Sequence, residues 1–291
     1  KQSEFGLLKA AVVTAIDDDN KRFQYIDKTG QYAWIEWPGM AWARPFIDDD
    51  HQGEAPQLPS QIVKVGELVY LRKLSENQWQ LSQFPDASSA LVALNPNDGA
   101  IIALTGGYDF YQSEFNRVTQ AKRQVGSNIK PFIYSAALEK GLTLATLIND
   151  APINQWDESQ GTAWRPKNSP PTYGGPTHVR IGLAQSKNVM AVRLMRSLGV
   201  EKTIDHLTKF GFDKSDLPPN ESLSLGSAAL TPLSLIRGMS AFANGGYLVE
   251  SNLIDRVLDV SGNIILQPTK LIASDANQDE APIEDHQMPA P

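Results

Sequence analysis

The feature that most constrains this chain is Ser127-x-x-Lys130, which opens an apolar stretch with helical spacing. Pro131 follows directly and is compatible with a helix start, because the first four N–H groups of a helix have no partner inside it. Residues three apart share one helix face, so we expect the Lys130 amine near the Ser127 hydroxyl, whose proton a partly desolvated lysine can accept. The pattern predicts a nucleophile helix beginning close to Ser127. Taken alone, the pattern fits a capping serine beside an exposed lysine better, and the downstream sequence reverses that preference.

Residues 7–84 carry five short β-rich runs separated by tight-turn sequences. We expect strands at 8–16, 23–27, 31–37, 67–74 and 78–83. Five short strands with an irregular excursion near 38–61 predict a small barrel of the OB type. An OB barrel that binds nucleic acid needs a basic groove. The net charge of −7 and the acidic residues of this region argue against a nucleic acid partner; they are Asp48, Asp49, Asp50 and Glu54.

Four tryptophans of this β region leave two interpretations open: Trp34, Trp37, Trp42 and Trp79. They can form a face that stacks on sugars or bases, or they can pack in the core or at the domain junction. Aromatic side chains supply much of the buried area of small cores, which favours packing. We interpret the region as a structural or docking module, with another protein as its expected partner.

The rest of the chain mixes helices and short strands. Two apolar runs, 90–95 and 100–104, are joined by a Pro-Asn-Asp-Gly turn and predict a hairpin. Because both runs are apolar on both faces, we expect them inside a sheet covered by helices. We expect helices at 179–184 with Thr177 as N-cap, 188–198 with Gly199 as C-cap, 203–210 and 231–244, and strands at 247–254 and 255–259.

Two stretches around the serine motif carry further predictions. Arg117, Lys122 and Arg123 precede Lys130 and give this approach a cationic character. Such a field lowers the pKa of a neighbouring amine and attracts a carboxylate; a merely solvated basic edge is the alternative. The proline- and glycine-rich stretch 165–176 predicts a stiff loop, and a stiff loop of this length is typical of a site rather than a spacer.

Composition excludes several classes of site. The chain has 291 residues, 41% of them hydrophobic, and no cysteine, so disulfides and thiolate metal sites are excluded. His51, His178, His206 and His286 are scattered without ligand spacing. No apolar run is long enough to span a membrane. The chain starts without a methionine and ends abruptly, and we interpret it as an excised piece.

Ser127-x-x-Lys130 followed by Ser186-x-Asn188 resembles the first two signatures of the penicillin-binding and serine β-lactamase superfamily. The sequence around them resembles the transpeptidase domain of class A high-molecular-weight penicillin-binding proteins, over roughly 88–265. One subgroup of these enzymes carries an OB-like insert ahead of that domain. The resembling segments are Leu94-Asn-Pro-Asn-Asp-Gly99, Phe115-Asn-Arg117, Gln120-Ala-Lys-Arg-Gln-Val-Gly126, Trp164-Arg-Pro-Lys-Asn168, Tyr173-Gly-Gly175, Leu225-Gly-Ser227, Thr231-Pro-Leu233 and Phe242-Ala-Asn-Gly-Gly246.

The resemblance implies a D,D-transpeptidase and a role for each motif residue. Ser127 would attack the penultimate D-Ala carbonyl of a peptidoglycan stem peptide, release the terminal D-Ala and leave an acyl-enzyme, which the amine of a second stem resolves as a cross-link. Lys130 would accept the serine proton, Ser186 would relay a proton to the leaving amine, and Asn188 would bind the substrate amide. β-Lactams resemble the D-Ala-D-Ala end and would acylate Ser127. No cofactor is expected.

The resemblance also implies an α+β fold class: a truncated penicillin-binding transpeptidase domain at 87–268, preceded by an OB-like module at 1–86 and followed by an acidic, disordered or loop segment at 269–291. The third family signature, Lys-Thr-Gly, should follow Ser186-x-Asn188, but the only copy is Lys28-Thr29-Gly30, which we interpret as a hairpin turn. We interpret Ser75-x-Asn77 likewise as a chance match. The transpeptidase domain is therefore expected to lack its Lys-Thr-Gly part.

In the family, such a domain belongs to a bifunctional cell-wall synthase. The resemblance implies a membrane anchor and a glycosyltransferase domain outside this chain, and a location on the periplasmic side of the bacterial inner membrane. Two alternatives stay open. One is a D,D-carboxypeptidase or serine β-lactamase of the same superfamily, and the other is an inactive scaffold or docking fragment.

Overall fold

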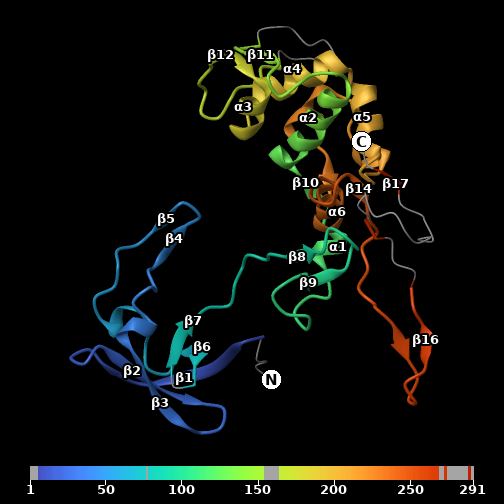
Figure 1. Ribbon diagram of the computed structural model, residues 1–291. Helices are drawn as coiled ribbons and strands as arrows, with labels where there is room; N and C mark the ends of the chain where they lie inside the picture. Colours follow the sequence, from blue (N-terminus) through green and yellow to red (C-terminus); the bar gives the residue numbers. More distant parts are fainter. Residues whose placement is uncertain (1–5, 77, 154–163, 269–271, 274–287, 290–291) are drawn as a thin grey trace. The chain divides into compact units, whose positions relative to one another are not determined.

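The computed structural model describes residues 6–76, 78–153, 164–268, 272–273 and 288–289. The chain divides into two compact units. The first comprises Lys1–Ser89 with Gly107–Glu114, and the second comprises Ala90–Gly106 with Phe115–Pro291 (Figure 1). Each unit is described by itself. Of the expected acidic segment 269–291, most residues lie outside the described ones, and the boundaries at 86/87 and 268/269 stay predictions.

The first unit is built on a five-stranded antiparallel sheet of order β3-β2-β1-β6-β7. Its strands are β1 (Leu8–Asp17), β2 (Arg22–Asp27), β3 (Tyr32–Glu36), β6 (Leu68–Ser75) and β7 (Gln78–Ser82). All five lie where the β-rich runs predicted them, within one or two residues at each end. The excursion between β3 and β6 adds what the sequence did not indicate: η1 (Trp37–Gly39), a short hairpin of β4 (Phe46–Asp48) and β5 (His51–Gln52), and η2 (Pro59–Gln61).

The tryptophans of this unit differ in burial. Trp37 and Trp79 pack against the buried cluster that includes Phe23, so packing is confirmed for them. Trp34 and Trp42 are exposed, at 36% and 44%. The Arg22 guanidinium lies over the Trp34 ring, and Trp42 Nε1 donates to Leu81 O.

Lys28-Thr29-Gly30 forms the turn between β2 and β3, as expected. Gly30 has φ +83°, a left-handed conformation that favours glycine, and its N–H donates to Asp27 O. Ser75 ends β6, while Asn77 of the second chance match lies outside the described residues.

The second unit is a helical bundle around α2 (Lys130–Glu139), which continues from the 3₁₀ turn η3 (Gly126–Ile129). Around it lie α1 (Arg117–Gln120), α3 (Val179–Ala184), α4 (Asn188–Leu198), α5 (Val200–Thr208), η5 (Lys214–Asp216), η6 (Glu221–Leu225) and α6 (Pro232–Ala243). The short strands are β10 (Arg123–Gln124) with β13 (Ala229–Leu230), β11 (Leu147–Asp150) with β12 (Gly175–His178), β14 (Tyr247–Leu248) with β17 (Met288–Pro289), and β15 (Val257–Leu258) with β16 (Ile264–Leu266).

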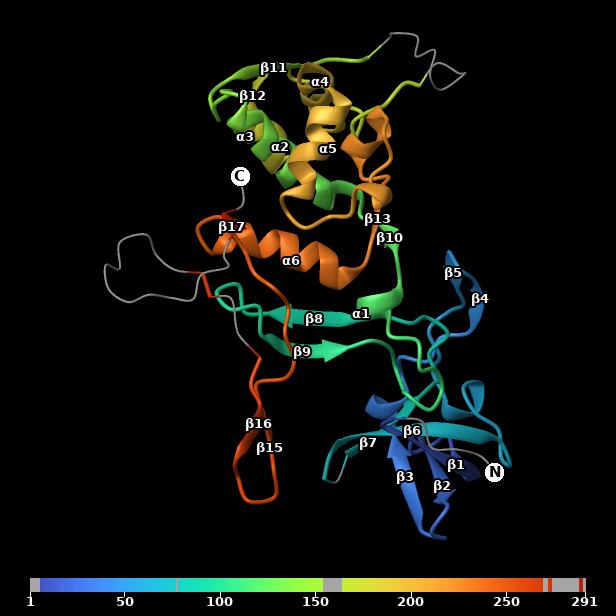
Figure 2. The ribbon, with the colours of Figure 1, turned by 90° about the vertical axis from the view of Figure 1, so that its right-hand side faces the viewer.

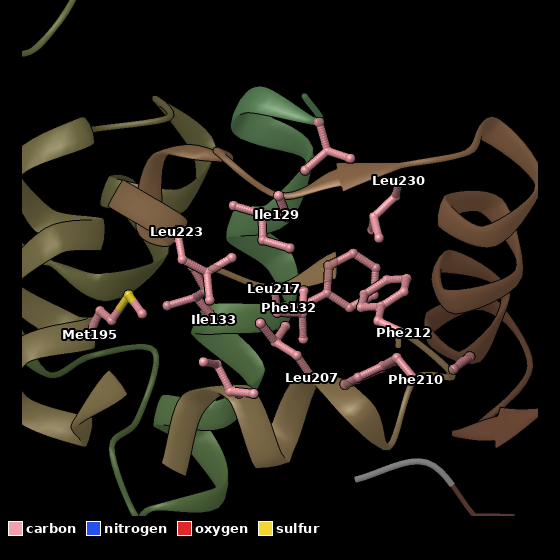
Figure 3. Close-up of a cluster of buried hydrophobic side chains, with 14 residues drawn as sticks. Ile129, Phe132, Ile133, Met195, Leu207, Phe210, Phe212, Leu217, Leu223 and Leu230 are labelled. Carbon is pink, nitrogen blue, oxygen red and sulfur yellow. The ribbon is translucent and has the colours of Figure 1, made fainter. Parts of the chain in front are cut away.

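Side chains of η3 and α2 lie at the centre of the main core (Figure 3). The Phe132 ring meets the rings of Phe210 and Phe212 edge to face, with centroids 4.8 and 4.9 Å apart. Ile129 and Ile133 are fully buried beside it. Because packing against several elements fixes a helix in place, the start of α2 is a rigid base for the side chains it carries.

Helix ends follow the sequence signals with two corrections. His178, not Thr177, is the N-cap of α3, because Thr177 Oγ1 instead donates to Gly175 O within β12. Helix α5 begins at Val200 rather than at 203, because Gly199 with φ +86° ends α4 and starts α5 at once. Thr231 caps α6 as predicted, since its Oγ1 accepts from Ser234 N.

The hairpin of β8 (Leu91–Leu94) and β9 (Ile101–Thr105) forms as predicted, but its expected place inside a larger sheet is wrong. It is a two-stranded sheet along which α6 runs on one side (Figure 2). On the hairpin, Ile102 is 72% and Leu91 56% exposed. Apolar residues on both faces of a strand predict that both faces are covered. In this hairpin α6 covers one side.

Candidate active site

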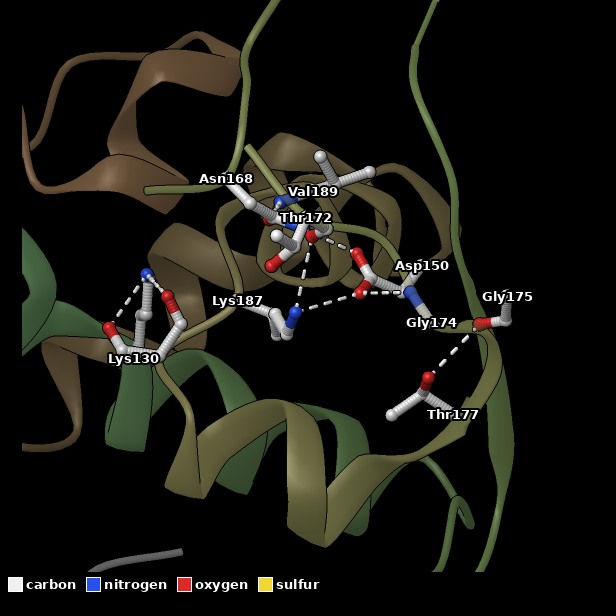
Figure 4. A network of polar contacts seen from close by, with 10 residues as sticks. Lys130, Asp150, Asn168, Thr172, Gly174, Gly175, Thr177, Lys187 and Val189 are labelled. Atoms are coloured by element: carbon white, nitrogen blue, oxygen red, sulfur yellow. Dashed lines mark hydrogen bonds and ion pairs between the residues drawn. The ribbon is translucent and has the colours of Figure 1, made fainter. Parts of the chain in front are cut away.

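Lys130 brings together two segments that are far apart in the sequence. Its side chain, drawn in Figure 4, is buried, at 1% exposed. Its Nζ donates to Ser186 O at 2.6 Å, Ser186 Oγ at 3.0 Å and Asn188 Oδ1 at 2.7 Å. Three of the four residues expected at the site are therefore joined around one amine. These contacts use all three donors that an ammonium group has.

Ser127 lies one turn before Lys130 on the same helical segment. The Lys130 N–H donates to Ser127 O, so the two residues lie one helical turn apart. Ser127 is exposed where Lys130 is buried. Directly before it, β10 pairs with β13 and Gly126 takes φ +55°, which lets the chain turn from the strand into the helix.

Burial lowers the pKa of Lys130 from its usual range to about 8. The expectation that neighbouring cations lower this pKa is wrong, since desolvation is its cause and Lys122 is itself neutralised by Asp216, 2.6 Å away. With a pKa near 8, about a tenth of Lys130 is neutral at pH 7, which an unshifted lysine does not approach. A neutral amine can accept a proton from a hydroxyl within hydrogen-bond distance, and Ser186 Oγ lies at that distance, 3.0 Å from Lys130 Nζ.

Ser186 occupies a backbone position where glycine is usual. Its φ is +51°, and it follows α3 in a Schellman arrangement in which Ser186 N donates to Leu183 O and Lys187 N donates to Gly182 O. The left-handed conformation is strained for a residue with a side chain. Ser186 is exposed, so its hydroxyl is within reach of a ligand as well as of Lys130.

Asn188 begins α4 and is held from both ends of its amide. Its Oδ1 accepts from Lys130 Nζ, and its Nδ2 donates to Lys167 O at 2.8 Å. The loop that carries Lys167 is the stiff loop 165–176, so this loop contacts the site as predicted. A cavity of about 210 Å³ opens next to Ser186 between this loop and the α3–α4 joint; its lining is Asn168, Ser169, Pro170, Thr172, Gln185, Ser186 and Lys187.

Two buried polar residues beside the site were missed from the sequence. Asp150, fully buried at the end of β11, accepts from Asn168 Nδ2 at 2.6 Å and Gly174 N at 2.9 Å and lies 3.1 Å from Lys187 Nζ. Burial pushes the pKa of Asp150 up, but the bonds from Asn168, Gly174 and Lys187 outweigh it and hold this pKa below its usual value. Asn168 lies in the segment that carried the resemblance, whereas no local pattern marks Asp150.

Other kinds of site find no support in the described part of the chain. Over residues 6–153 and 164–268, apart from position 77, no three His, Asp or Glu side chains are placed to hold a metal ion. No helix among the described residues is long and apolar enough to cross a membrane.

Comparison with known proteins gives consistent results for both units. Residues 89–288 match the family model of the penicillin binding protein transpeptidase domain, and residues 1–87 match that of the penicillin-binding protein OB-like domain. Penicillin-binding protein 1A of Vibrio cholerae is 53% identical over 264 residues, 89% of this chain and 32% of the relative. The Escherichia coli protein of that name is 45% identical over 269 residues, 92% and 31%.

The fold agrees with a solved relative. The crystal structure of penicillin-binding protein 1A from Haemophilus influenzae superposes with a TM-score of 0.82 at 38% identity, covering 94% of this chain and 38% of that one. The chain thus spans about a third of the length of the curated relatives it matches. The expected fold class, a transpeptidase domain preceded by an OB-like domain, is confirmed.

Proposed function

The chain belongs to the penicillin-binding proteins, as a transpeptidase domain with an OB-like domain ahead of it, and from this premise we propose that it carries the acyl-serine centre of a D,D-transpeptidase. The substrate is the D-Ala-D-Ala end of a peptidoglycan stem peptide, and the product is a cross-link to a second stem. The observation that carries the proposal is the buried Lys130 amine, one turn from Ser127 and bonded to Ser186 and Asn188.

In the first half-reaction Ser127 Oγ bonds to the penultimate D-Ala carbonyl carbon while its proton passes to neutral Lys130. The carbon–nitrogen bond to the terminal D-Ala then breaks. The leaving nitrogen takes up a proton from Lys130 through the Ser186 hydroxyl, which lies 3.0 Å from Nζ. Asn188 holds the substrate amide beside the serine. The result is an ester between Ser127 and the stem peptide, with free D-Ala released.

In the second half-reaction the amine of a neighbouring stem attacks this ester. Its nitrogen bonds to the acyl carbon and gives up a proton along the same route, and Ser127 regains its hydrogen. In a β-lactam, Ser127 would attack the ring carbonyl and the ring amide bond would break, but the leaving nitrogen stays tethered to the acyl group. We therefore expect covalent inhibition at Ser127.

The protonation state of Lys130 fits this exchange of roles. A neutral amine has two N–H groups and one lone pair. It can keep donating to Ser186 O and Asn188 Oδ1, which leaves its lone pair to accept the Ser127 proton. Once protonated, Lys130 also donates to Ser186 Oγ, the acceptor through which the proton leaves again.

A hydrolase of the same superfamily, either a carboxypeptidase or a β-lactamase, is less well supported. A hydrolase would need a carboxylate that activates water for deacylation, and among the described residues Asp150 is the one buried carboxylate. It already accepts from Asn168, Gly174 and Lys187. We infer that the acyl-enzyme waits for an amine rather than for water.

The test is labelling of the full-length protein with a fluorescent penicillin, followed by mass spectrometry of the labelled peptide. We expect the label on Ser127, and no label in Ser127→Ala. Ser135→Ala is the matched control, because Ser135 lies on the same helix with its hydroxyl on His206 and Phe132 O. Label on another residue would contradict the assignment. Release of penicilloic acid within minutes would favour the hydrolase.

The wider setting is part of the same proposal. We propose that the full-length protein also carries a glycosyltransferase domain and a membrane anchor, and that this chain works on the periplasmic side of the bacterial inner membrane. We place the OB-like module at 1–86, as a docking module for a protein partner, and the transpeptidase part at 87–268. A lipid-linked disaccharide polymerisation assay on the full-length protein tests the glycosyltransferase.

A further inference from the structure

We infer that Asp150 and Lys187 are positioning residues that hold Ser186 in the conformation its proton relay requires. The inference rests on the proposed function and deepens it. It concerns Lys187, the middle residue of Ser186-x-Asn188, to which the motif assigns no role. It also concerns Asp150, which belongs to no motif.

The first step is the burial of Asp150. Its carboxylate is fully buried and receives three donors, from Asn168, Gly174 and Lys187. A buried charge is stable only when it is paired and hydrogen-bonded. The Lys187 ammonium is the positive partner, with its side chain 14% exposed. The pair is thus an internal anchor rather than a surface ion pair.

The second step is the direction in which Lys187 points. Figure 4 shows Lys130 on one side of the α3–α4 joint, and Lys187 reaching the other way, toward Asp150 and Thr172. Lys187 Nζ also donates to Thr172 O at 3.3 Å. Lys187 therefore ties the joint to β11 and to the stiff loop, on the side away from Lys130.

The third step is the backbone strain at Ser186. Ser186 has φ +51° at the Schellman position, where glycine is usual, and such a conformation persists only when its surroundings enforce it. Lys187 is the next residue, in the place where a Schellman motif often has an apolar contact. Here Lys187 instead makes the ion pair with Asp150, which holds the chain immediately after the strained residue.

The fourth step links the same hub to Asn188. Asn168 donates to Asp150 Oδ1 and accepts from Val189 N, the residue after Asn188. Asn188 Nδ2 donates to Lys167 O, the residue before Asn168. One buried carboxylate thus fixes the residues that follow both Ser186 and Asn188. The Lys130 amine bonds to Ser186 and Asn188, whereas Lys187 pairs with Asp150, so the expected effect of Asp150 and Lys187 on the chemistry is indirect.

The experiment is a double-mutant cycle on acylation of the full-length protein by a fluorescent penicillin, with the thermal midpoint measured for every variant. Lys187→Met keeps the apolar stem and removes the ammonium. We expect it to slow acylation by about tenfold or more, because small displacements of a proton relay are costly. Lys214→Met is the matched control, since it breaks the exposed pair with Asp205 and should stay within about twofold of wild type.

In the Ser186→Ala background we expect Lys187→Met to change the acylation rate by less than about twofold, because the hydroxyl it positions is gone. Equal slowing in both backgrounds would overturn the inference, since Lys187 would then act independently of Ser186. The covalent label accumulates, so even slow variants can be measured.

A second variant keeps the test decisive if Lys187→Met folds poorly. Asp150→Asn with Lys187→Met leaves no buried charge unpaired, so we expect its thermal midpoint to recover toward wild type while its acylation stays slow. Recovery of both would show a purely structural role and overturn the inference. Wild-type protein that takes no label at all would refute the proposed function instead, which separates the two failures.

Discussion

The backbones of Gly126 and Gly226 are in direct contact immediately before Ser127. Gly126 N donates to Gly226 O at 3.1 Å, and a Cβ atom on Gly226 would lie 2.0 Å from Gly126 O. Gly226 also has φ +85°, as the C-cap of η6. The turn that presents Ser127 therefore rests on a second chain segment at a distance that a side chain does not permit.

The first prediction is that Gly226→Ala destabilises the protein by more than about 3 kcal/mol and abolishes acylation, because it adds a clash to backbone strain. The matched control is Gly245→Ala, with φ +86° and no atom within 4 Å of the added Cβ. It should cost about 1 kcal/mol through strain alone. Urea unfolding and penicillin labelling check both; equal costs would contradict the role of the contact.

The second prediction concerns the pH dependence of acylation. The pKa of Lys130 is lowered to about 8 and its neutral form is the proposed base, so the rate should rise with pH and level off above about 8. Lys130→Ala should lose acylation nearly as completely as Ser127→Ala, because the two act as a unit. Labelling reactions quenched at a series of times and pH values give the dependence of the acylation rate on pH. A flat profile between pH 6 and 9 would rule out Lys130 as the base.

The third prediction concerns stability in acid. His206 is buried between Ser135 Oγ at 2.8 Å and Glu139 Oε2 at 2.6 Å, and burial lowers its pKa despite the opposing effect of Glu139. The unfolded chain therefore binds more protons just below about pH 6.5, so stability should fall as pH drops through that range. In His206→Gln the thermal midpoint should depend less on pH. His51→Gln, at an exposed position in the other unit, is the control.

The fourth prediction concerns Lys28-Thr29-Gly30. Lys28→Ala should leave penicillin acylation of the full-length protein unchanged, because this turn joins β2 and β3 of the first unit, whereas Lys130, Ser186 and Asn188 belong to the second. A clear loss of acylation with an unchanged circular dichroism spectrum would mean that this copy serves as the third signature.

The sequence predicted well the features that depend on neighbouring residues. Helix α4 runs from Asn188 to Leu198 with Gly199 as its end, because its apolar spacing and its C-cap are local signals. The Thr231 cap and the five strands of the first unit were accessible for the same reason. The convergence of Ser186 and Asn188 on Lys130 was expected from the resemblance alone, since no spacing rule brings together residues 56 and 58 positions apart.

What the sequence did not predict depends on contacts between distant segments. Asp150 looks like any acidic residue before a proline-containing loop, and only folding brings Lys187, 37 positions on, within 3.1 Å of it. The cause of the low Lys130 pKa was misjudged for the same reason: charges are visible in a sequence, whereas desolvation by packed neighbours is not. The exposed Ile102 shows the converse, because hydrophobicity predicts a preference for burial but not which layer provides it.

The left-handed conformation of Ser186 has a consequence for directed evolution of this protein. At φ +51° glycine should make the folded protein more stable than serine does, by roughly 1 kcal/mol. A library screened only for heat resistance should therefore be enriched in Ser186→Gly. Each Ser186→Gly variant would lack the hydroxyl that lies beside Lys130. One dihedral angle therefore sets selection for heat resistance against the proton relay proposed for Ser186, and thermostable variants obtained without an activity screen would be enriched in proteins that fold well and acylate slowly.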